Sequence, residues 1–132
     1  MKSKLLFILV ILVLSLLNCT KEPGEGGKAS IKGKVFAKYY NSTYTLLIGK
    51  SYAPEEDVYI VYGNNISYND HIKTNYDGSY EFKYLRKGKY KIYVYSKDST
   101  LTNPAKKYPV IINTEITERK QSIVLDDLVI FD

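Results

Sequence analysis

The chain contains one imidazole, His71, and one thiol, Cys19, and these are its most reactive side chains. A catalytic histidine needs a carboxylate that orients its ring, and the acid beside it in sequence is Asp70. Neighbouring residues of a strand point to opposite faces, so Asp70 cannot orient the His71 ring. We therefore expect His71 to be an ordinary strand residue, and we predict that the chain has no catalytic residue and is not an enzyme.

The carboxylates gather in two short runs, Glu55-Glu56-Asp57 and Asp126-Asp127. Adjacent acids on a strand diverge, whereas the two carboxyl groups of a glycoside hydrolase converge across a cleft. The sequence also lacks the Asp-x-Asp-x-Asp spacing of a calcium loop and, with one Cys and one His, the ligand set of most zinc sites. We expect no metal ion and no cofactor.

Cys19 stands at the end of an apolar run. Lys2 and Lys4 precede residues 5–17, in the order of the charged start and apolar stretch of a secretory signal peptide. A membrane-spanning segment needs about 20 apolar residues, so a signal peptide is favoured over a transmembrane anchor. The residues Leu16-Leu17-Asn18-Cys19 resemble the lipobox of bacterial lipoproteins. This resemblance implies cleavage before Cys19 and attachment of diacylglycerol to its sulfur.

Residues 1–18 are thus predicted to be a lipoprotein signal peptide, and residues 19–28 to be the lipidated Cys19 and a flexible, Gly-rich tether. The Lys21-Glu22 pair resembles part of the export signal of Bacteroidetes-type lipoproteins. We expect a lipid anchor in the outer membrane, with the extracellular face favoured over the periplasmic face. Loss of residues 1–18 leaves a mildly basic protein, so we expect no nucleic-acid partner.

From residue 29 onward apolar residues recur at every second position, the period of a strand with one buried face. The first strand is predicted to bury Ile31, Gly33, Val35 and Ala37 and to expose the Lys residues and Phe36 between them. Further strands are predicted over residues 57–62, 67–74, 80–84, 90–95, 108–113 and 121–131, the last interrupted at Asp126-Asp127. About seven short strands without a helical period predict an all-β domain over residues 29–132, a Greek-key β-sandwich.

Two of these strands are predicted to pair as a hairpin around Gly88. In the first strand Tyr80, Phe82 and Tyr84 share one face, and in the second strand Tyr90, Ile92 and Val94 do. We expect Tyr80, Phe82, Ile92 and Val94 to be buried, and Gly88 to hold a conformation that a side chain would penalise.

Residues 74–94 combine several short features in a fixed order: Thr74, the turn Asp77-Gly78, the aromatic strand from Tyr80 to Tyr84, Leu85, Gly88 and the alternating Tyr90, Ile92 and Val94. This order is similar to the core signature of carboxypeptidase regulatory-like domains, which are transthyretin-like Greek-key sandwiches. The resemblance extends over about residues 29–125, and it implies a structural or interaction module without catalytic residues. Lys87 stands where that family usually has Pro.

A long aromatic segment separates the first two predicted strands, where the family usually has a short loop. We expect residues 39–52 to fold as an extra hairpin, because they carry too much apolar surface for a free loop. The hairpin either covers the outward-pointing Phe36, Tyr93 and Tyr95 or forms a binding surface together with them. The candidate binding residues are Phe36, Tyr39, Tyr40, Tyr44, Tyr52, Tyr93 and Tyr95.

Three classes of function remain open. The favoured class is a non-enzymatic lipoprotein of the cell envelope whose sandwich serves as a binding or structural module for a glycan or an envelope protein. The alternative is a carrier or chaperone of a small apolar ligand, which in transthyretin-like proteins requires a channel formed by oligomerisation. The least favoured class is an enzyme.

The predicted lipidation can be tested at Cys19 itself. The Cys19→Ser protein lacks the sulfur that receives the lipid, so it should accumulate in a soluble or unprocessed form. Membrane fractionation, with mass spectrometry of the N-terminal peptide, measures this directly. Unchanged membrane retention of the variant would contradict the prediction.

Overall fold

The structure is a computed structural model, and it describes residues 1–16, 22–98 and 106–132. The predicted lipidation site, Cys19, lies outside the described residues. The helix α1 (Lys2–Leu16) covers the apolar run that is predicted to be part of the signal peptide. No helix in the described ranges is long and apolar enough to cross a membrane.

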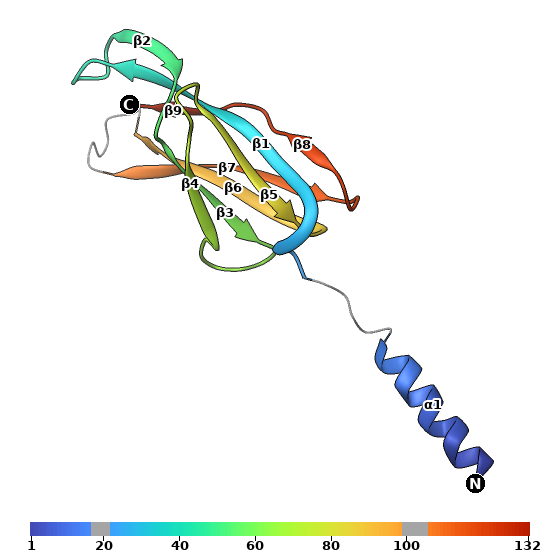
Figure 1. Cartoon of the computed structure of the whole chain (residues 1–132). Helices are drawn as coiled ribbons and strands as arrows, with labels where there is room; N and C mark the ends of the chain where they lie inside the picture. The colour runs from blue at the N-terminus through green and yellow to red at the C-terminus, as the bar shows by residue number, and fades with distance from the viewer. Residues whose placement is uncertain (17–21, 99–105) are drawn as a thin grey trace.

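The strands form two sheets that pack face to face (Figure 1). In sheet 1 the central strand is β1 (Glu25–Tyr40), which pairs with β2 (Leu47–Tyr52), β5 (Ser79–Leu85), β8 (Ser122–Val124) and β9 (Leu128–Phe131). Sheet 2 has the order β4 (Asp70–Lys73), β3 (Asp57–Tyr62), β6 (Gly88–Lys97), β7 (Lys107–Ile116). The prediction of an all-β sandwich is confirmed, and its assignment to the Greek-key, transthyretin-like type stays a prediction.

The apolar alternation of β1 explains its place in the core. Ile31 and Val35 have no exposed surface, whereas Lys32 between them is exposed. β1 pairs in antiparallel fashion with β5 and β2, and in parallel fashion with β8 and β9. Asp126 and Asp127 separate β8 from β9, at the interruption that the sequence predicts. The inward side chains of both sheets form one hydrophobic core.

The predicted hairpin around Gly88 is wrong. β5 pairs with β1 in sheet 1, whereas β6 pairs with β3 and β7 in sheet 2. The link Arg86-Lys87 therefore carries the chain from one sheet to the other. The four side chains predicted to be buried, Tyr80, Phe82, Ile92 and Val94, are buried in the core. Alternation identifies the buried face of each strand, but it does not distinguish strands that lie side by side from strands that face each other.

Tyr84 does not share the buried face of Tyr80 and Phe82. Its φ angle is 59°, its side chain is 71% exposed, and Leu85 is buried in its place. Opposite this point the pairing shifts, because Ile31 of β1 lies across from Phe82 and Ala29 lies across from Leu85. This β-bulge in β5 inserts an extra residue and reverses the faces of the residues that follow it.

The prediction of a flexible tether over residues 19–28 is wrong for its second half. β1 begins at Glu25, and Pro23 and Gly24 pack on the domain. The backbone N–H of Gly24 donates to the Tyr90 hydroxyl at 2.8 Å, and this hydroxyl donates to the Arg86 carbonyl at 2.6 Å. Arg86 N–H in turn donates to the Gly24 carbonyl at 2.8 Å. We call this set of three hydrogen bonds the Tyr90 clamp.

Glycines bring the backbone close to its neighbours at the Tyr90 clamp. Gly88 has a φ of 140°, and a Cβ added to it would collide with the ring of Pro23. The missing side chain of Gly88 therefore lets Pro23, a residue of the predicted tether, pack closely against the domain.

The insertion forms the expected hairpin, which consists of the end of β1, a turn and β2. The Asn41 side chain stabilises the turn, since its Oδ1 accepts hydrogen bonds from the backbone N–H groups of Thr45 and Leu46. The hairpin extends sheet 1 at the end of the sandwich that also carries the C-terminus (Figure 1). Leu46 and Ile48 on it are 62% and 65% exposed.

Phe82→Ala should lower the free energy of unfolding by about 3 to 5 kcal/mol, because the ring fills the core between the sheets. Tyr84→Ala is the matched control on the same strand, and it should change stability by less than about 1 kcal/mol, because the Tyr84 ring is in solvent. Urea unfolding followed by circular dichroism measures both. Equal effects of the two substitutions would contradict the bulge.

Candidate ligand-binding face

The structure does not bring the seven predicted binding residues together. Tyr39 faces inward and packs against the core. Phe36, Tyr40, Tyr44 and Tyr52 belong to sheet 1 and its hairpin, whereas Tyr93 and Tyr95 stand on the outer face of sheet 2. The hairpin therefore does not cover Tyr93 and Tyr95, and the two groups of rings lie on opposite sides of the sandwich.

The rings of sheet 1 form two small contacts. Phe36 and Tyr52 are cross-strand partners whose ring centroids lie 5.3 Å apart. The Tyr52 hydroxyl donates to Asp127 at 3.0 Å, and this hydrogen bond to a carboxylate raises the pKa of Tyr52. Tyr40 stacks on Tyr44 at 5.9 Å near the hairpin turn. These contacts tie the hairpin rings to one another.

The outer face of sheet 2 carries a larger group, which we call the five-ring cluster: Tyr59, Tyr68, His71, Tyr93 and Tyr95. The pairing registers align His71 of β4 with Tyr59 of β3, Tyr59 with Tyr93 of β6, and Tyr93 with Ile111 of β7. Tyr59 is central, because its ring contacts the other four at centroid distances of 4.9 to 5.7 Å. Tyr59 and Tyr93 are nearly parallel, with 13° between their planes.

The five-ring cluster is partly open to solvent. Tyr68 and Tyr95 are 47% and 43% exposed, and the neighbouring Ile111 is 45% exposed. Partial burial raises the pKa of Tyr93 to about 12, with a further contribution from the adjacent Tyr95. Burial also raises the pKa of Tyr59. These phenols are therefore neutral at physiological pH, and they present apolar ring surface together with hydroxyl groups.

His71 is part of this cluster, and sequence reasoning did not assign it there. Its ring lies 5.7 Å from Tyr59 and 5.6 Å from Tyr68. The Asp70 carboxylate accepts a hydrogen bond from the backbone N–H of His71 at 2.8 Å. Alternation along residues 57–62 places Tyr59 on the face of the strand that points away from the buried Val58 and Ile60. The outward position of Tyr59 could therefore be predicted from the sequence. Tyr68 lies in the loop before β4, so the strand period could not predict which way its ring points.

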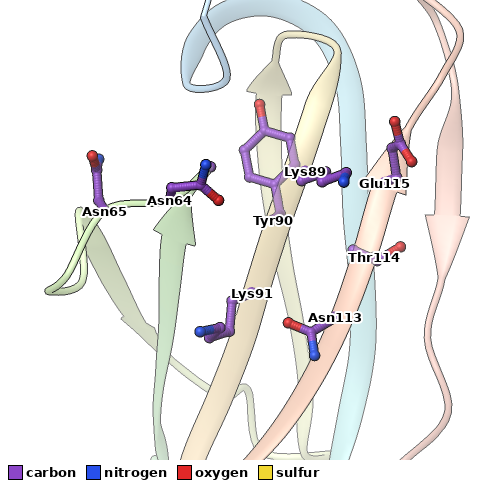
Figure 2. A pocket seen from close by; sticks show the side chains of 9 residues that line it. Asn64, Asn65, Lys89, Tyr90, Lys91, Asn113, Thr114 and Glu115 are labelled. Carbon is purple, nitrogen blue, oxygen red and sulfur yellow. The ribbon is translucent and has the colours of Figure 1, made fainter.

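A polar groove of about 650 Å³ adjoins the five-ring cluster along β6 and β7 (Figure 2). Figure 2 shows Asn64 and Asn65 on one side, Asn113 and Glu115 on the other, and Lys91 between them. Lys91 faces Asn113 and Lys89 faces Glu115 across the β6–β7 pair. Because Lys91 and Tyr93 are two residues apart on one strand, the groove and the cluster share one face.

Hydrogen bonds to the backbone and to the Asn69 side chain fix the loop that lines this groove. The N–H of Gly63 donates to the Lys89 carbonyl at 2.8 Å, and the N–H of Tyr62 donates to the Asn69 side chain at 2.8 Å. Asn69 also accepts a hydrogen bond from Asn65 at 3.1 Å. In residues 1–16, 22–98 and 106–132 no group of three or more His, Cys, Asp or Glu could hold a metal ion. The face is thus built from rings, amides, amines and one carboxylate.

Comparisons with known proteins do not identify a family. No family model matches the sequence, and no curated protein matches it. Among solved structures, the chain is similar to the crystal structure of a "putative carbohydrate binding protein" from Pseudomonas aeruginosa. The identity is 10%, the alignment covers 78% of this chain and 90% of that chain, and the TM-score is 0.45. At these values the similarity carries no inference about function.

The raised pKa of Tyr93 predicts a loss of stability at alkaline pH. The pKa is about 12 in the folded protein against an ordinary value of 10.0, so the folded state binds this proton more tightly than the unfolded state. Its contribution is present below about pH 10 and is lost as the pH rises from about 10 to about 12. Unfolding in urea between about pH 9 and pH 11.5 should therefore show a smaller loss of stability for Tyr93→Phe than for the wild type. Tyr76→Phe, at a ring that is 92% exposed, should behave like the wild type, and identical profiles for all three proteins would contradict the prediction.

Proposed function

We propose that the domain is a non-catalytic glycan-binding module whose ligand lies on the five-ring cluster and in the adjoining groove. The supporting observation is the continuity of ring surface and polar groups along β3, β6 and β7. Isolated exposed rings are ordinary, but four rings that all contact Tyr59, beside an open polar groove, are a concentrated apolar surface. Such a surface fits a ligand with one apolar face and a polar rim.

A sugar ring has this chemistry. Its axial C–H groups form an apolar face that stacks on an aromatic ring, and its hydroxyls are both donors and acceptors. The amides of Asn64, Asn65 and Asn113 can donate and accept, the Lys91 ammonium donates, and the Glu115 carboxylate accepts. A chain of sugars could thus stack on Tyr93 and Tyr95 and extend its hydroxyls toward the groove.

The alternatives receive less support from the described residues. The space between the two sheets is filled by buried side chains of both, so a carrier of small apolar ligands would need a channel between copies of the chain. An enzyme needs a positioned acid or base, and the His71 ring is packed among tyrosines rather than held by a carboxylate. A partner protein could also use the five-ring cluster, and the binding experiment below separates it from a glycan.

We further propose that the module is anchored by a lipid on Cys19 in the outer membrane, facing the cell exterior. The support is the order of charged start, apolar run and lipobox-like residues in the sequence. The similarity to carboxypeptidase regulatory-like domains leads us to propose the same class of non-catalytic module. Its lipid would hold the glycan-binding face at the cell surface.

The proposal can be tested with the full chain on an array of soluble polysaccharides and oligosaccharides. Tyr93→Ala and Asn113→Ala should each weaken binding to the retained glycan about tenfold or more, because one removes a stacking surface and the other a groove amide. A factor of ten in affinity corresponds to about 1.4 kcal/mol. Tyr76→Ala and Tyr52→Ala are matched controls on a loop and on sheet 1, and they should bind like the wild type.

Circular dichroism should show that each variant remains folded. Absence of binding to every glycan on the array would contradict the glycan proposal. Equal losses for Tyr52→Ala and Tyr93→Ala would place the site elsewhere.

A further inference from the structure

A second pocket, of about 400 Å³, lies where the chain enters the domain, and its charged lining residues are all cations. Three separate segments contribute to it: the start of β1, the link between β5 and β6, and the turn after β7. Its lining consists of Gly26, Gly27, Lys28, Leu85, Arg86, Lys87 and Arg119. We call it the basic pocket.

Within the described ranges, the cations of the basic pocket form no ion pair. Among the described residues, the ion pairs join Lys73 to Asp57 and Lys97 to Asp132, both outside the pocket. The Nε atom of Arg86 is buried, and it has no hydrogen-bond partner in the described part of the chain. A buried guanidinium nitrogen without a partner is costly, and an anion in the pocket would offset this cost by its attraction to the positive charge of the half-buried Arg86 side chain.

The Tyr90 clamp holds Arg86 in place before any ligand binds. The Arg86 backbone N–H and carbonyl are both fixed, the first by Gly24 and the second by the Tyr90 hydroxyl. Its side chain runs along the glycines, since a Cβ on Gly26 would lie 4.0 Å from Arg86 Nε. At Gly27 a Cβ would collide with the Leu85 carbonyl, so only glycine allows this close approach. These contacts fix the backbone of Arg86 and of the glycines that line the pocket.

Four cations around one small pocket favour a compact ligand with more than one negative charge. A phosphate group has this charge, and its oxygens match the planar fork of an arginine. Arg86 offers a half-buried guanidinium on a fixed backbone, while Lys28, Lys87 and Arg119 lie around it at the surface. The chemistry of the basic pocket is thus that of a phosphate site.

The position of the basic pocket indicates the source of the phosphate. Cys19 precedes Pro23 by four residues, and an extended chain spans at most about 3.6 Å per residue, so the two are separated by no more than roughly 14 Å. The start of β1 lies at the end of the sandwich opposite the β2 hairpin (Figure 1). We propose that the basic pocket binds the phosphate of an anionic lipid headgroup in the membrane that holds Cys19. This inference rests on the proposed lipid anchor and not on the glycan site.

The first arm of the test asks whether the pocket binds phosphate at all. The full chain in a non-ionic detergent is titrated with inorganic phosphate, and the amide resonances of Gly26 and Gly27 are followed by NMR. Saturable shifts are expected for the wild type and for Arg86→Lys at higher concentration. They should be lost in the Arg86→Gln/Arg119→Gln protein and retained in the charge-matched control Lys50→Gln/Lys106→Gln, whose cations lie outside the pocket.

The second arm asks whether the source is a lipid. The full chain is reconstituted in phosphatidylcholine vesicles, with or without about 30% phosphatidylglycerol, and the acetylation rate of Lys87 is measured by mass spectrometry. Anionic vesicles should slow acetylation of Lys87 at least threefold and leave that of Lys50 unchanged. The Arg86→Gln/Arg119→Gln protein should lose this protection. Arg119→Gln alone, at an exposed turn residue, should weaken it without disturbing the fold.

The two arms separate the outcomes. Shifts with phosphate but no protection by anionic vesicles would overturn the lipid source and leave a site for soluble phosphate compounds. Neither shifts nor protection would overturn the basic pocket as an anion site. Flotation with pure phosphatidylcholine vesicles reports on the anchor independently of charge, so failure of the anchor and failure of the pocket are distinguishable.

Discussion

The pairing of β1 is the interaction on which the rest of the structure depends. Each of the other four strands of sheet 1 pairs with β1, on one edge or the other. Its inward residues, with Ile31 and Val35 at their centre, also form one wall of the core. A β-sheet needs hydrogen bonds along its edges and an apolar face against its partner, and β1 supplies both for half of the sandwich. The sequence that forms this strand is therefore the least replaceable part of the domain.

The five-ring cluster follows from the same alternation on the other sheet. Val58 and Ile60 of β3 and Ile92 and Val94 of β6 face the core, so the tyrosines between them must face outward. The register between the two strands then places Tyr59 directly beside Tyr93. An outer face of a sandwich is normally solvated and polar, and rings on it are retained at some cost in solubility. Their concentration on β3, β6 and the neighbouring β4 is the feature on which the proposed binding site rests.

Alternation along the chain correctly predicted buried side chains in several strands, as Phe82 and Ile92 show. It could not predict the partners of a strand, and so β5 and β6 were assigned to one hairpin although they belong to different sheets. It also failed at Tyr84, whose positive φ angle lies at a β-bulge that exchanges the inward and outward positions of the strand. Composition was misleading at Gly24, because the Tyr90 hydroxyl fixes a segment that its glycines suggest is flexible. Three of the five rings of the cluster, Tyr59, Tyr68 and His71, were not predicted as site residues, because their meeting depends on register between strands and on the position of a loop residue.

If the domain is anchored and binds its ligand as proposed above, the Tyr90 clamp has a mechanical consequence. Tension from the anchor enters at Gly24, which is bonded to Tyr90 of sheet 2 as well as continuing into β1 of sheet 1. The force is therefore shared between the two sheets at the point of entry. Along β1 it acts parallel to the strand, at right angles to the ladder hydrogen bonds, so many bonds must yield together rather than one after another. A force along β1 is therefore opposed by several hydrogen bonds at once.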